Sequence, residues 1–311
     1  MATWIEASAP GSLMLFGEHA VLHGRPAIVG SVDVRVRAHA RLRRDGRLIL
    51  QSALGRYEAP MEAKTPPPRE LRFAVGAVRR AAEGVLGGVE LDIGSDFSPT
   101  VGLGSSAAVT VAVLAVVTAL RGQPLNPEFL LQTGRQVVRE AQGGVGSGAD
   151  VAASVFGGLC LYHMDDVRPE RLPGIPPIVL IYAGYKTPTA EVIHRVESAR
   201  RADPARYERL FDAAGRLTMA AAAAFRLGDL SDAGLRMNAA QTVLEELGVC
   251  DSTLAAIVAA LRSAPGVRGA KISGSGLGDG VIGLGGTAGY RGPGCRMDVR
   301  LAESGVRLEA T

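Results

Sequence analysis

The stretch SPTVGLGSSA, residues 98–107, lies between a predicted strand at 89–93 and an apolar helix predicted over 107–120. Its centre is Gly102-Leu103-Gly104-Ser105-Ser106. Glycines let backbone N–H groups approach an anion closely, and the start of a helix adds unpaired donors and a favourable dipole. The two serine hydroxyls can bind phosphate oxygens or a magnesium ion. The stretch predicts a phosphate loop, although a plain capped helix explains the composition equally well.

Two common nucleotide-binding loops are excluded. Gly102-x-Gly104-x-x-Ala107 fits the relaxed dinucleotide fingerprint, which also needs an acid about 20 residues further on, after a second strand. Residues 107–127 contain no Asp or Glu, and the pattern that follows is helical. The Walker sequence GxxxxGK[ST] does not occur anywhere in the chain. The loop therefore belongs to another type.

The sequence around the loop predicts strands and helices without regular alternation, which indicates an α+β fold. Short alternating or β-branched segments predict strands at 4–8, 13–16, 26–29, 32–42, 47–51, 159–163, 178–182, 267–273, 280–284, 297–301 and 306–308. Apolar residues at helical spacing predict helices at 71–86, 127–140, 189–200, 204–227, 231–247 and 252–263. Asn126 is placed to cap the helix that begins at 127. Charge and prolines cluster at 165–177, so a domain boundary is predicted there.

Composition narrows the class of protein. Of the 311 residues, 47% are hydrophobic and 21% are charged, which is typical of a globular chain. The net charge is only +3 and the Arg-rich stretch 35–44 alternates with apolar residues, so no nucleic-acid partner is predicted. Three well-separated cysteines, the absence of a signal sequence and an apolar run too short to span a bilayer predict a cytoplasmic protein without a membrane partner.

Three motifs occur in order along the chain: APGSLMLFGEHAVLHG at 9–24, PTVGLGSSAA at 99–108 and KISGSGLGDG at 271–280, with GSGAD at 146–150 between the last two. Together they resemble the GHMP superfamily of small-molecule kinases, and the GEHAVxHG form is most similar to its mevalonate kinase branch. The resemblance implies an N-terminal ribosomal-S5-like αβ domain, residues 1–170, that binds ATP. It also implies a ferredoxin-like αβ domain with added helices, residues 171–311, that completes the acceptor site.

The resemblance implies an ATP- and Mg²⁺-dependent phosphorylation of a small-molecule alcohol, most simply mevalonate to 5-phosphomevalonate. In the site that the resemblance implies, Asp150 is the acid that receives or orients the proton of the substrate hydroxyl, and Ser106 and Glu140 are metal ligands. The acceptor is lined by Glu18, His19 and Thr189. The nucleotide is bound by Gly102, Leu103, Gly104, Ser105, Ser106, Ala107, Gly274, Ser275 and Gly276. Taken singly, Asp150 would be a helix-capping acid, Glu140 a surface acid and His19 a structural histidine.

The chain departs from the family pattern at a catalytic position, because Ser12 stands where a lysine is usual. A serine cannot supply the positive charge that stabilises the transition state. The hypothesis is that Lys186 replaces it, so that Asp150, Ser12 and Lys186 form the catalytic set, although a solvent-exposed loop lysine is the simpler interpretation. In the third motif, Leu277 and Asp279 replace glycines.

Alternatives remain open at this point. A kinase for phosphomevalonate or a sugar would need further cations, for which Arg37, Lys186 and Arg195 are candidates. A nucleotide-binding pseudokinase or sensor is the alternative from another class. Assembly into a homodimer is a further alternative that the sequence leaves open.

Overall fold

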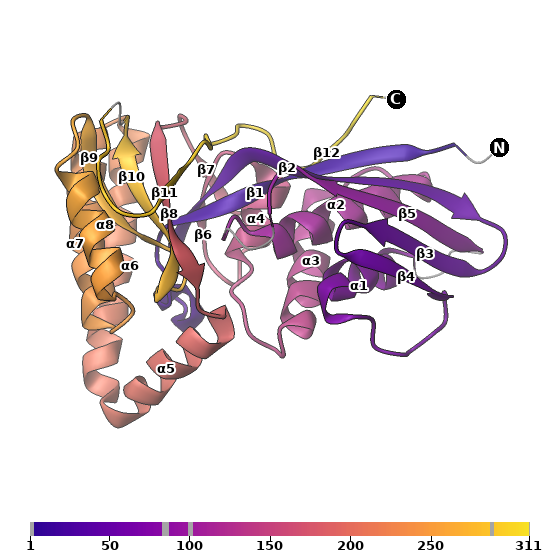
Figure 1. Cartoon of the computed structure of the whole chain (residues 1–311), viewed down its shortest axis with the longest axis horizontal. Coiled ribbons are helices and arrows are strands. Elements are labelled where there is room, and N and C mark those ends of the chain that lie inside the picture. Colours follow the sequence, from indigo (N-terminus) through magenta and orange to yellow (C-terminus); the bar gives the residue numbers. More distant parts are fainter. Residues whose placement is uncertain (1–2, 83–86, 99–101, 287–288, 311) are drawn as a thin grey trace.

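The computed structural model describes residues 3–82, 87–98, 102–286 and 289–310, in which two units lie side by side (Figure 1). Each unit is a β-sheet with helices packed against it. Pro99, Thr100 and Val101 of the phosphate-loop stretch lie outside the described residues.

The first sheet is mostly antiparallel. Across it the strands follow the order β12-β1-β2-β5-β3-β4, while β6 pairs with β2 and with β7. The neighbours β3 and β5 are parallel. Its strands are β1 (Ile5–Phe16), β2 (Ala27–Arg43), β3 (Arg47–Ser52), β4 (Gly55–Pro60), β5 (Gly88–Ser95), β6 (Leu159–Tyr162), β7 (Glu170–Leu172) and β12 (Arg307–Leu308).

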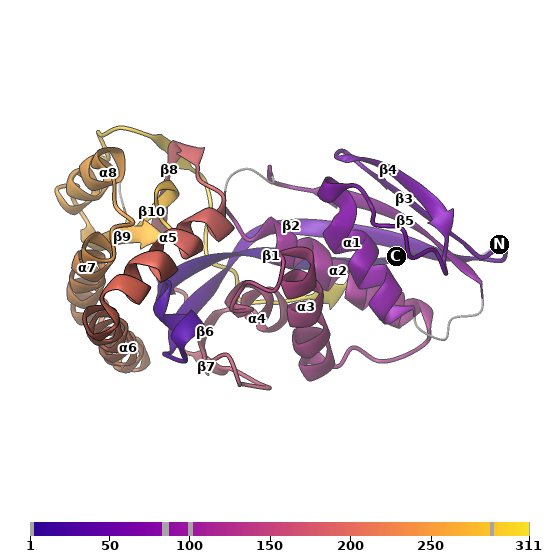
Figure 2. The ribbon, with the colours of Figure 1, turned by 90° about the horizontal axis from the view of Figure 1, so that it is seen from below.

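Four helices cover one face of this sheet (Figure 2): α1 (Arg72–Ala81), α2 (Ser105–Leu120), α3 (Pro127–Ala141) and α4 (Ala149–Phe156). α2 lies in the centre, in contact with β1, β2 and the three other helices. This enclosure explains why its sequence has no polar face, and it confirms the predicted buried helix. Within α2, Thr110 and Thr118 donate their hydroxyls to carbonyls one turn earlier.

The second sheet is antiparallel, in the order β11 (Cys295–Met297), β8 (Ile178–Lys186), β10 (Gly278–Gly285) and β9 (Val267–Ser273). Its helices are α5 (Thr189–Ala202), α6 (Pro204–Arg226), α7 (Leu230–Glu246) and α8 (Ser252–Arg262). α7 and α8 pack against β9, and α6 packs against α7. Asp203, Asp229 and Asp251 accept hydrogen bonds from the first turns of α6, α7 and α8, which explains where these helices begin.

The chain crosses from the first sheet to the second between β7 and β8, and its last residues return. β12 pairs with β1, and Leu301 forms a bridge with Val32. The buried Arg35 guanidinium donates to the carbonyls of Ser8 at 3.0 Å and Gly305 at 2.8 Å. The division into domains 1–170 and 171–311 stays a prediction, and the C-terminal segment is physically part of the first sheet.

Several predicted boundaries need correction. The segments 4–8 and 13–16 form one strand, β1, and 26–29 and 32–42 form β2. Pro10 and Gly11 lie within β1 and not at its end. The register with β2 shifts between them, since Pro10 pairs with Arg35 and Gly11 with Val32, so the extra residues lie in β2. β4 and β7 were not predicted. The helix predicted at 71–86 corresponds to α1, which follows a 3₁₀ turn at Arg69–Leu71 and ends at Ala81, while residues 83–86 lie outside the described residues.

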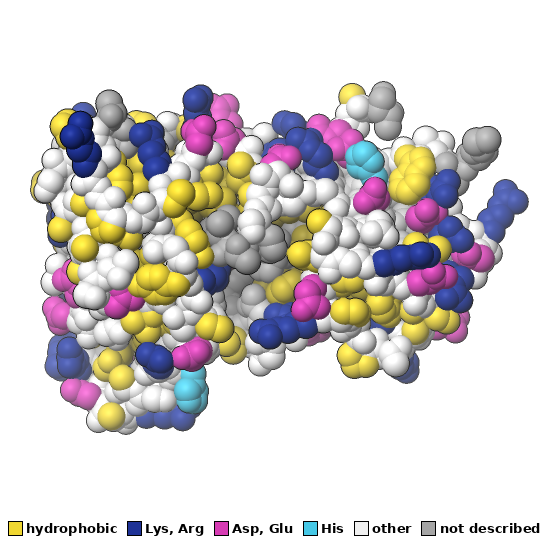
Figure 3. Space-filling view, in the orientation of Figure 1, with side chains coloured by type: hydrophobic (Ala, Val, Ile, Leu, Met, Phe, Trp, Pro, Cys, Tyr) yellow, Lys and Arg dark blue, Asp and Glu magenta, His cyan; other side chains and the backbone are white. Residues whose placement is uncertain are grey.

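On the face shown in Figure 3, the described Lys and Arg side chains are interspersed with Asp and Glu and form no continuous basic patch. Within the described part of the chain, no helix is both long enough and apolar enough to cross a membrane.

Candidate active site

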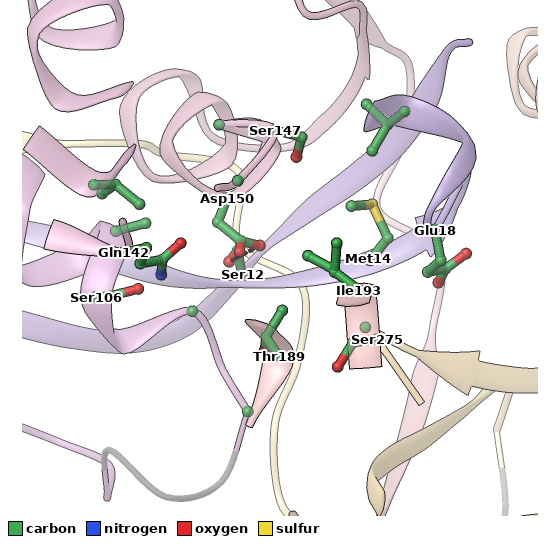
Figure 4. Close-up of a pocket in the computed structure, with 18 of the residues that line it drawn as sticks. Ser12, Met14, Glu18, Ser106, Gln142, Ser147, Asp150, Thr189, Ile193 and Ser275 are labelled. Carbon is green, nitrogen blue, oxygen red and sulfur yellow. Dashed lines mark hydrogen bonds between the residues drawn. The ribbon is translucent and has the colours of Figure 1, made fainter. Parts of the chain in front are cut away.

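A cavity of about 200 Å³ is lined by residues of both units. The first unit contributes β1, the phosphate loop and the turn before α4, and the second contributes the start of α5 and the β9–β10 loop. Figure 4 shows Asp150 and Ser12 in the middle. Ser106 and Gln142 lie on one side of them, and Glu18, Met14, Ile193 and Ser275 lie on the other.

The phosphate loop enters α2 through two left-handed glycines, Gly102 with φ 60° and Gly104 with φ 64°. A β-carbon on Gly104 would overlap the Ser12 hydroxyl, so glycine is required there. The amide of Ser12 in turn donates to the Leu103 carbonyl at 2.9 Å. The N-cap residue of α2 is Gly104, which has no side chain with which to cap the first turn. Because Ser105, Ser106 and Ala107 line the cavity at this helix start, the site fits an anion.

Asp150 lies in the first turn of α4, after the left-handed Gly148. It accepts a hydrogen bond from the Ser12 hydroxyl at 2.8 Å (Figure 4). Its carboxylate is open to the cavity. The protein that surrounds the carboxylate reduces its contact with water, and this desolvation raises the pKa of Asp150 above the usual value. The Ser12 hydrogen bond and the charge of Lys186 oppose that shift. A carboxylate with a raised pKa, in contact with a cavity, is suited to accept a proton.

The loop between β9 and β10 approaches the end of β1. Ser273 donates its hydroxyl to the Met14 carbonyl at 2.9 Å, and His19 Nε2 lies 2.9 Å from the Ser275 carbonyl. A carbonyl only accepts, so Nε2 carries the hydrogen. Burial lowers the pKa of His19, which leaves the ring neutral with Nδ1 as an acceptor. Gly274 and Ser275 line the cavity, whereas Gly276 packs against Val249.

Glu18 and Lys271 form an ion pair that is almost completely buried. Burial raises the pKa of Glu18, and the charge of Lys271 opposes this rise. Burial also lowers the pKa of Lys271. Glu18 contributes to the cavity wall, but its carboxylate is bonded to Lys271. This pair joins the first and third motifs.

The cavity wall near Glu18 combines apolar and polar side chains. Thr189, the first residue of α5, contributes a hydroxyl-bearing side chain. The apolar residues Met14, Val21, Leu22 and Ile193 belong to the lining. This part of the cavity therefore suits an acceptor that carries hydrocarbon as well as polar groups.

Lys186 ends β8 and lines the cavity, where its ammonium lies 3.0 Å from the Asp279 carboxylate. Among the described lining residues it is the one Lys or Arg side chain. Arg37 pairs with Asp96 and Arg195 with Glu191, and both lie outside the lining.

Glu140 is not brought to the cavity. It pairs with Arg80 of α1, and its side chain is 60% exposed. Val138 and Gln142 do line the cavity, and residues four apart share one face of a helix. Glu140 lies between them in sequence and so points to another face. Its predicted role as a metal ligand has no support in this geometry.

Among the residues at or beside the cavity that were missed from the sequence are Gln142, Lys271 and Asp279. Gln142 lines the cavity on the same side of Asp150 as Ser106 (Figure 4), and no signal in the sequence pointed to it. Lys271 lies within the third motif but looked like a strand residue. Asp279 was visible as a departure from glycine, and that departure was the available signal.

Comparison with known proteins identifies the family. Residues 71–158 match the family described as "GHMP kinases N terminal domain", and residues 221–289 match "GHMP kinases C terminal". The mevalonate kinase of Aeropyrum pernix is 34% identical over 285 residues, which cover 89% of this chain and 87% of that protein. The mevalonate kinase of Archaeoglobus fulgidus is 33% identical, over 97% of this chain and 99% of that protein.

The same fold occurs in a solved structure. The crystal structure of L. major mevalonate kinase in complex with R-mevalonate matches with a TM-score of 0.74 and 25% identity, over 92% of this chain and 89% of that one. The match extends over both units, so the two-unit α+β architecture predicted from the sequence is confirmed.

Proposed function

This chain belongs to the GHMP kinase family, and we propose that it transfers the terminal phosphoryl group of ATP to the primary hydroxyl of mevalonate. One observation carries the proposal: the Asp150–Ser12 pair lies between the phosphate loop and the partly apolar end of the cavity (Figure 4). A base in that place can reach an acceptor hydroxyl while the loop holds the donor phosphates.

In the proposed step the acceptor hydroxyl faces Asp150. Its proton passes to the Asp150 carboxylate, a new O–P bond forms, and the P–O bond to the leaving ADP breaks. The transferring group carries negative charge on its outer oxygens. Among the described residues that line the cavity, Lys186 is the one Lys or Arg side chain, and its ammonium can donate hydrogen bonds to those oxygens.

The residues present fit a magnesium ion. The Ser106 hydroxyl and the Asp150 carboxylate are hard oxygen donors on the cavity wall. Among the described residues there is no cluster of three or more His, Cys, Asp and Glu, which suits a cation held mainly by nucleotide phosphates. When bound, magnesium would offset the charge of those phosphates. We propose Ser106 as the ligand from α2.

Cavity chemistry supports mevalonate over the other acceptors. Mevalonate has one carboxylate, two hydroxyls and a methyl group, and the methyl suits the apolar wall of Met14, Leu22 and Ile193. Phosphomevalonate adds a phosphate, but Arg37 and Arg195 do not reach the cavity to meet it. A sugar would place hydroxyls against the apolar wall, where unpaired polar groups are costly.

We also propose that the chain works in the cytoplasm. Its three cysteines are free, which agrees with a reducing compartment.

An acceptor panel tests the function. With ATP and Mg²⁺, we expect ADP release with mevalonate but not with phosphomevalonate, homoserine or galactose, and a 5-phosphate in the ³¹P NMR spectrum of the product. Asp150→Asn should lower kcat by about 10²–10⁴-fold, because a general base contributes that much, while ATP still binds. ATP binding without turnover on any alcohol would instead favour the sensor.

Lys186 is tested by a matched pair of lysine variants. Lys186→Met should lower kcat by about 10²-fold or more, as the loss of one group that stabilises transition-state charge typically does. Lys64→Met is the control, because Lys64 is exposed and does not line the cavity. Equal turnover in both variants would remove Lys186 from the mechanism.

A further inference from the structure

Asp279 has a positive φ, a backbone conformation that costs free energy in any residue with a β-carbon. Within the described residues, His19, Leu277 and Asp279 are the non-glycine residues with positive φ, at 59°, 52° and 69°. Asp279 lies where the pairing of β8 with β10 is irregular, between Gly278 and Gly280. Its side chain is only 11% exposed, and its Oδ1 has no hydrogen-bond partner among the described residues. Backbone strain and an unsatisfied buried oxygen each cost free energy, and this cost indicates a function for the carboxylate.

The carboxylate of Asp279 connects two parts of the site. Its Oδ2 lies 3.0 Å from the ammonium of Lys186, at the end of β8. Its other face lies directly on Gly102, where an added β-carbon would overlap the carboxylate. Asp279 therefore holds Lys186 beside the phosphate loop, and glycine at 102 is what lets the two approach.

Lysine is rare in this chain, and Lys186 is the lysine that lines the cavity. Only three of its 34 lysine and arginine residues are lysines: Lys64, Lys186 and Lys271. Lys64 is exposed, and Lys271 is buried against Glu18. A lysine is a point charge on a flexible four-carbon stem, so without a partner its ammonium occupies many positions. A fixed anion restricts it to one.

We propose that Asp279 is a positioning residue that holds the ammonium of Lys186 over Gly102, so that the pair performs the task of the lysine absent at position 12. This rests on the proposed function, in which Lys186 meets the transferring phosphoryl group. An ammonium has three hydrogens, and one bonded to Asp279 leaves two for phosphoryl oxygens.

Asp279 is poorly placed for the other roles of a carboxylate in this site. Asp150 lies in the middle of the cavity and already has the Ser12 hydroxyl as a partner. Asp279 is instead pressed against the backbone of Gly102. An unpaired carboxylate there would repel the nucleotide phosphates, whereas the Lys186 ammonium at 3.0 Å offsets this repulsion and keeps hydrogens free for phosphoryl oxygens. The geometry therefore assigns it to Lys186.

A double-mutant cycle tests this assignment with Asp279→Asn, Lys186→Met and their combination. Asp279→Asn should lower kcat by about 10–100-fold, the range of coupling between residues in contact, and leave KM for ATP within about 3-fold. In the Lys186→Met background the same change should have no further effect. Asp279→Gly fits the left-handed backbone, so this variant should fold at least as stably and show the same kcat loss. Asp92→Asn, on the exposed side of β5, is the matched control.

A spectroscopic readout follows from the three lysines. Protein labelled with ¹³C at lysine Cε gives three signals, of which Lys186→Met identifies one. Asp279→Asn should move the Lys186 signal and leave those of Lys64 and Lys271 in place. The inference is overturned if the Lys186 signal does not move, or if Asp279→Asn lowers kcat equally with and without Lys186. Unchanged turnover in Lys186→Met removes Lys186 from the mechanism and overturns the inference as well, whereas failure of the proposed function is a separate outcome, in which the parent protein itself does not turn over mevalonate.

Discussion

Ser12 is the residue at which this site differs most from the expected pattern. The hydroxyl is buried, donates to Asp150 at 2.8 Å, and fits against Gly104, where a β-carbon would overlap it. A lysine at this position would bring a charge to the base, whereas serine brings a hydrogen bond. We propose that the charge comes from Lys186, which also opposes the rise that burial causes in the pKa of Asp150. In this proposal the two tasks of one residue are divided between two.

Removing the Ser12 hydroxyl should change the pH dependence of turnover. Asp150 must be ionised to act as a base, and the hydrogen bond favours its ionised form, so Ser12→Ala should raise the pKa of Asp150 further above its usual value. The acid limb of the kcat/KM profile should then move to higher pH. A hydrogen bond to a charged acceptor contributes about 1.5–3 kcal/mol, so we expect kcat/KM to fall at least ~10-fold on that limb.

Rates measured from pH 5 to 9 decide this point. At the alkaline end, where Asp150 is ionised in both proteins, Ser12→Ala should approach the parent rate. A loss of equal size at every pH would mean that Ser12 positions the substrate and does not tune the base.

The sequence was informative about single residues only where a motif fixed their place. Asp150, Ser106 and His19 lie on the cavity wall as expected. Glu140 does not, because the face that a helix presents depends on how it packs, and a spacing along the chain cannot show that. Lys186 was proposed from its type and neighbourhood, but its partner Asp279 is 93 positions away. Such a pair becomes visible only when β8 and β10 are placed side by side.

At the scale of elements, the phosphate loop and α2 depend on glycines for two separate reasons. Gly104 and Gly122 flank α2 and have nearly the same φ, 64° and 68°. A β-carbon on Gly104 would overlap the Ser12 hydroxyl, whereas one on Gly122 would have no atom within 4 Å. A comparison of the two glycines therefore separates the effect of backbone strain from the effect of steric overlap.

We expect both Gly104→Ala and Gly122→Ala to lose about 1–2 kcal/mol of unfolding free energy, the cost of a left-handed residue with a β-carbon. Only Gly104→Ala should also lose turnover, by about 10²-fold, because it displaces Ser12 from Asp150 and the loop from the phosphates. Urea unfolding and kcat measured on the same preparations test both parts. If Gly104→Ala remained as active as Gly122→Ala, the contact between Ser12 and Gly104 would have no catalytic importance.

Elements were predicted well where their pattern is local. The helices of the second unit begin at Asp caps that the sequence displays, and Asn126 caps α3 through the amide of Phe129 at 3.0 Å, as predicted. Strand ends were predicted poorly around Pro10 and Gly30, which lie within long strands. Proline and glycine occur both at irregularities within a strand and at strand ends, and only the pairing with a neighbouring strand distinguishes the two cases.

At the scale of the whole molecule, the two units are held together beside the cavity by a buried charge pair. Glu18 follows β1 in the first unit, and Lys271 belongs to β9 in the second. The pair lies next to two further contacts between the units, His19 with Ser275 and Ser273 with Met14. The contact that joins the units thus also forms part of the cavity wall.

Breaking this pair on one side should destabilise the protein strongly. Lys271→Met leaves a buried carboxylate without its partner, which typically costs about 3–5 kcal/mol. The loss should depend on pH. Burial already raises the pKa of Glu18 above 4.5, and without Lys271 it rises further. The folded variant then binds a proton that the unfolded chain has released, so its stability falls as pH rises above 4.5. Its deficit should be large at pH 8 and shrink towards pH 5.

The double variant Glu18→Gln with Lys271→Met provides the control, since it removes both charges and keeps the shape of the pair. Replacing a buried ion pair by neutral groups is far less costly than stranding one charge, so the double variant should be more stable than Lys271→Met at pH 8. It should also have lost the pH dependence. Urea unfolding of the parent and both variants at pH 5 and pH 8 measures this. A Lys271→Met deficit that is equal at the two pH values would show that Glu18 does not remain buried once its partner is gone, and that the units separate at this contact.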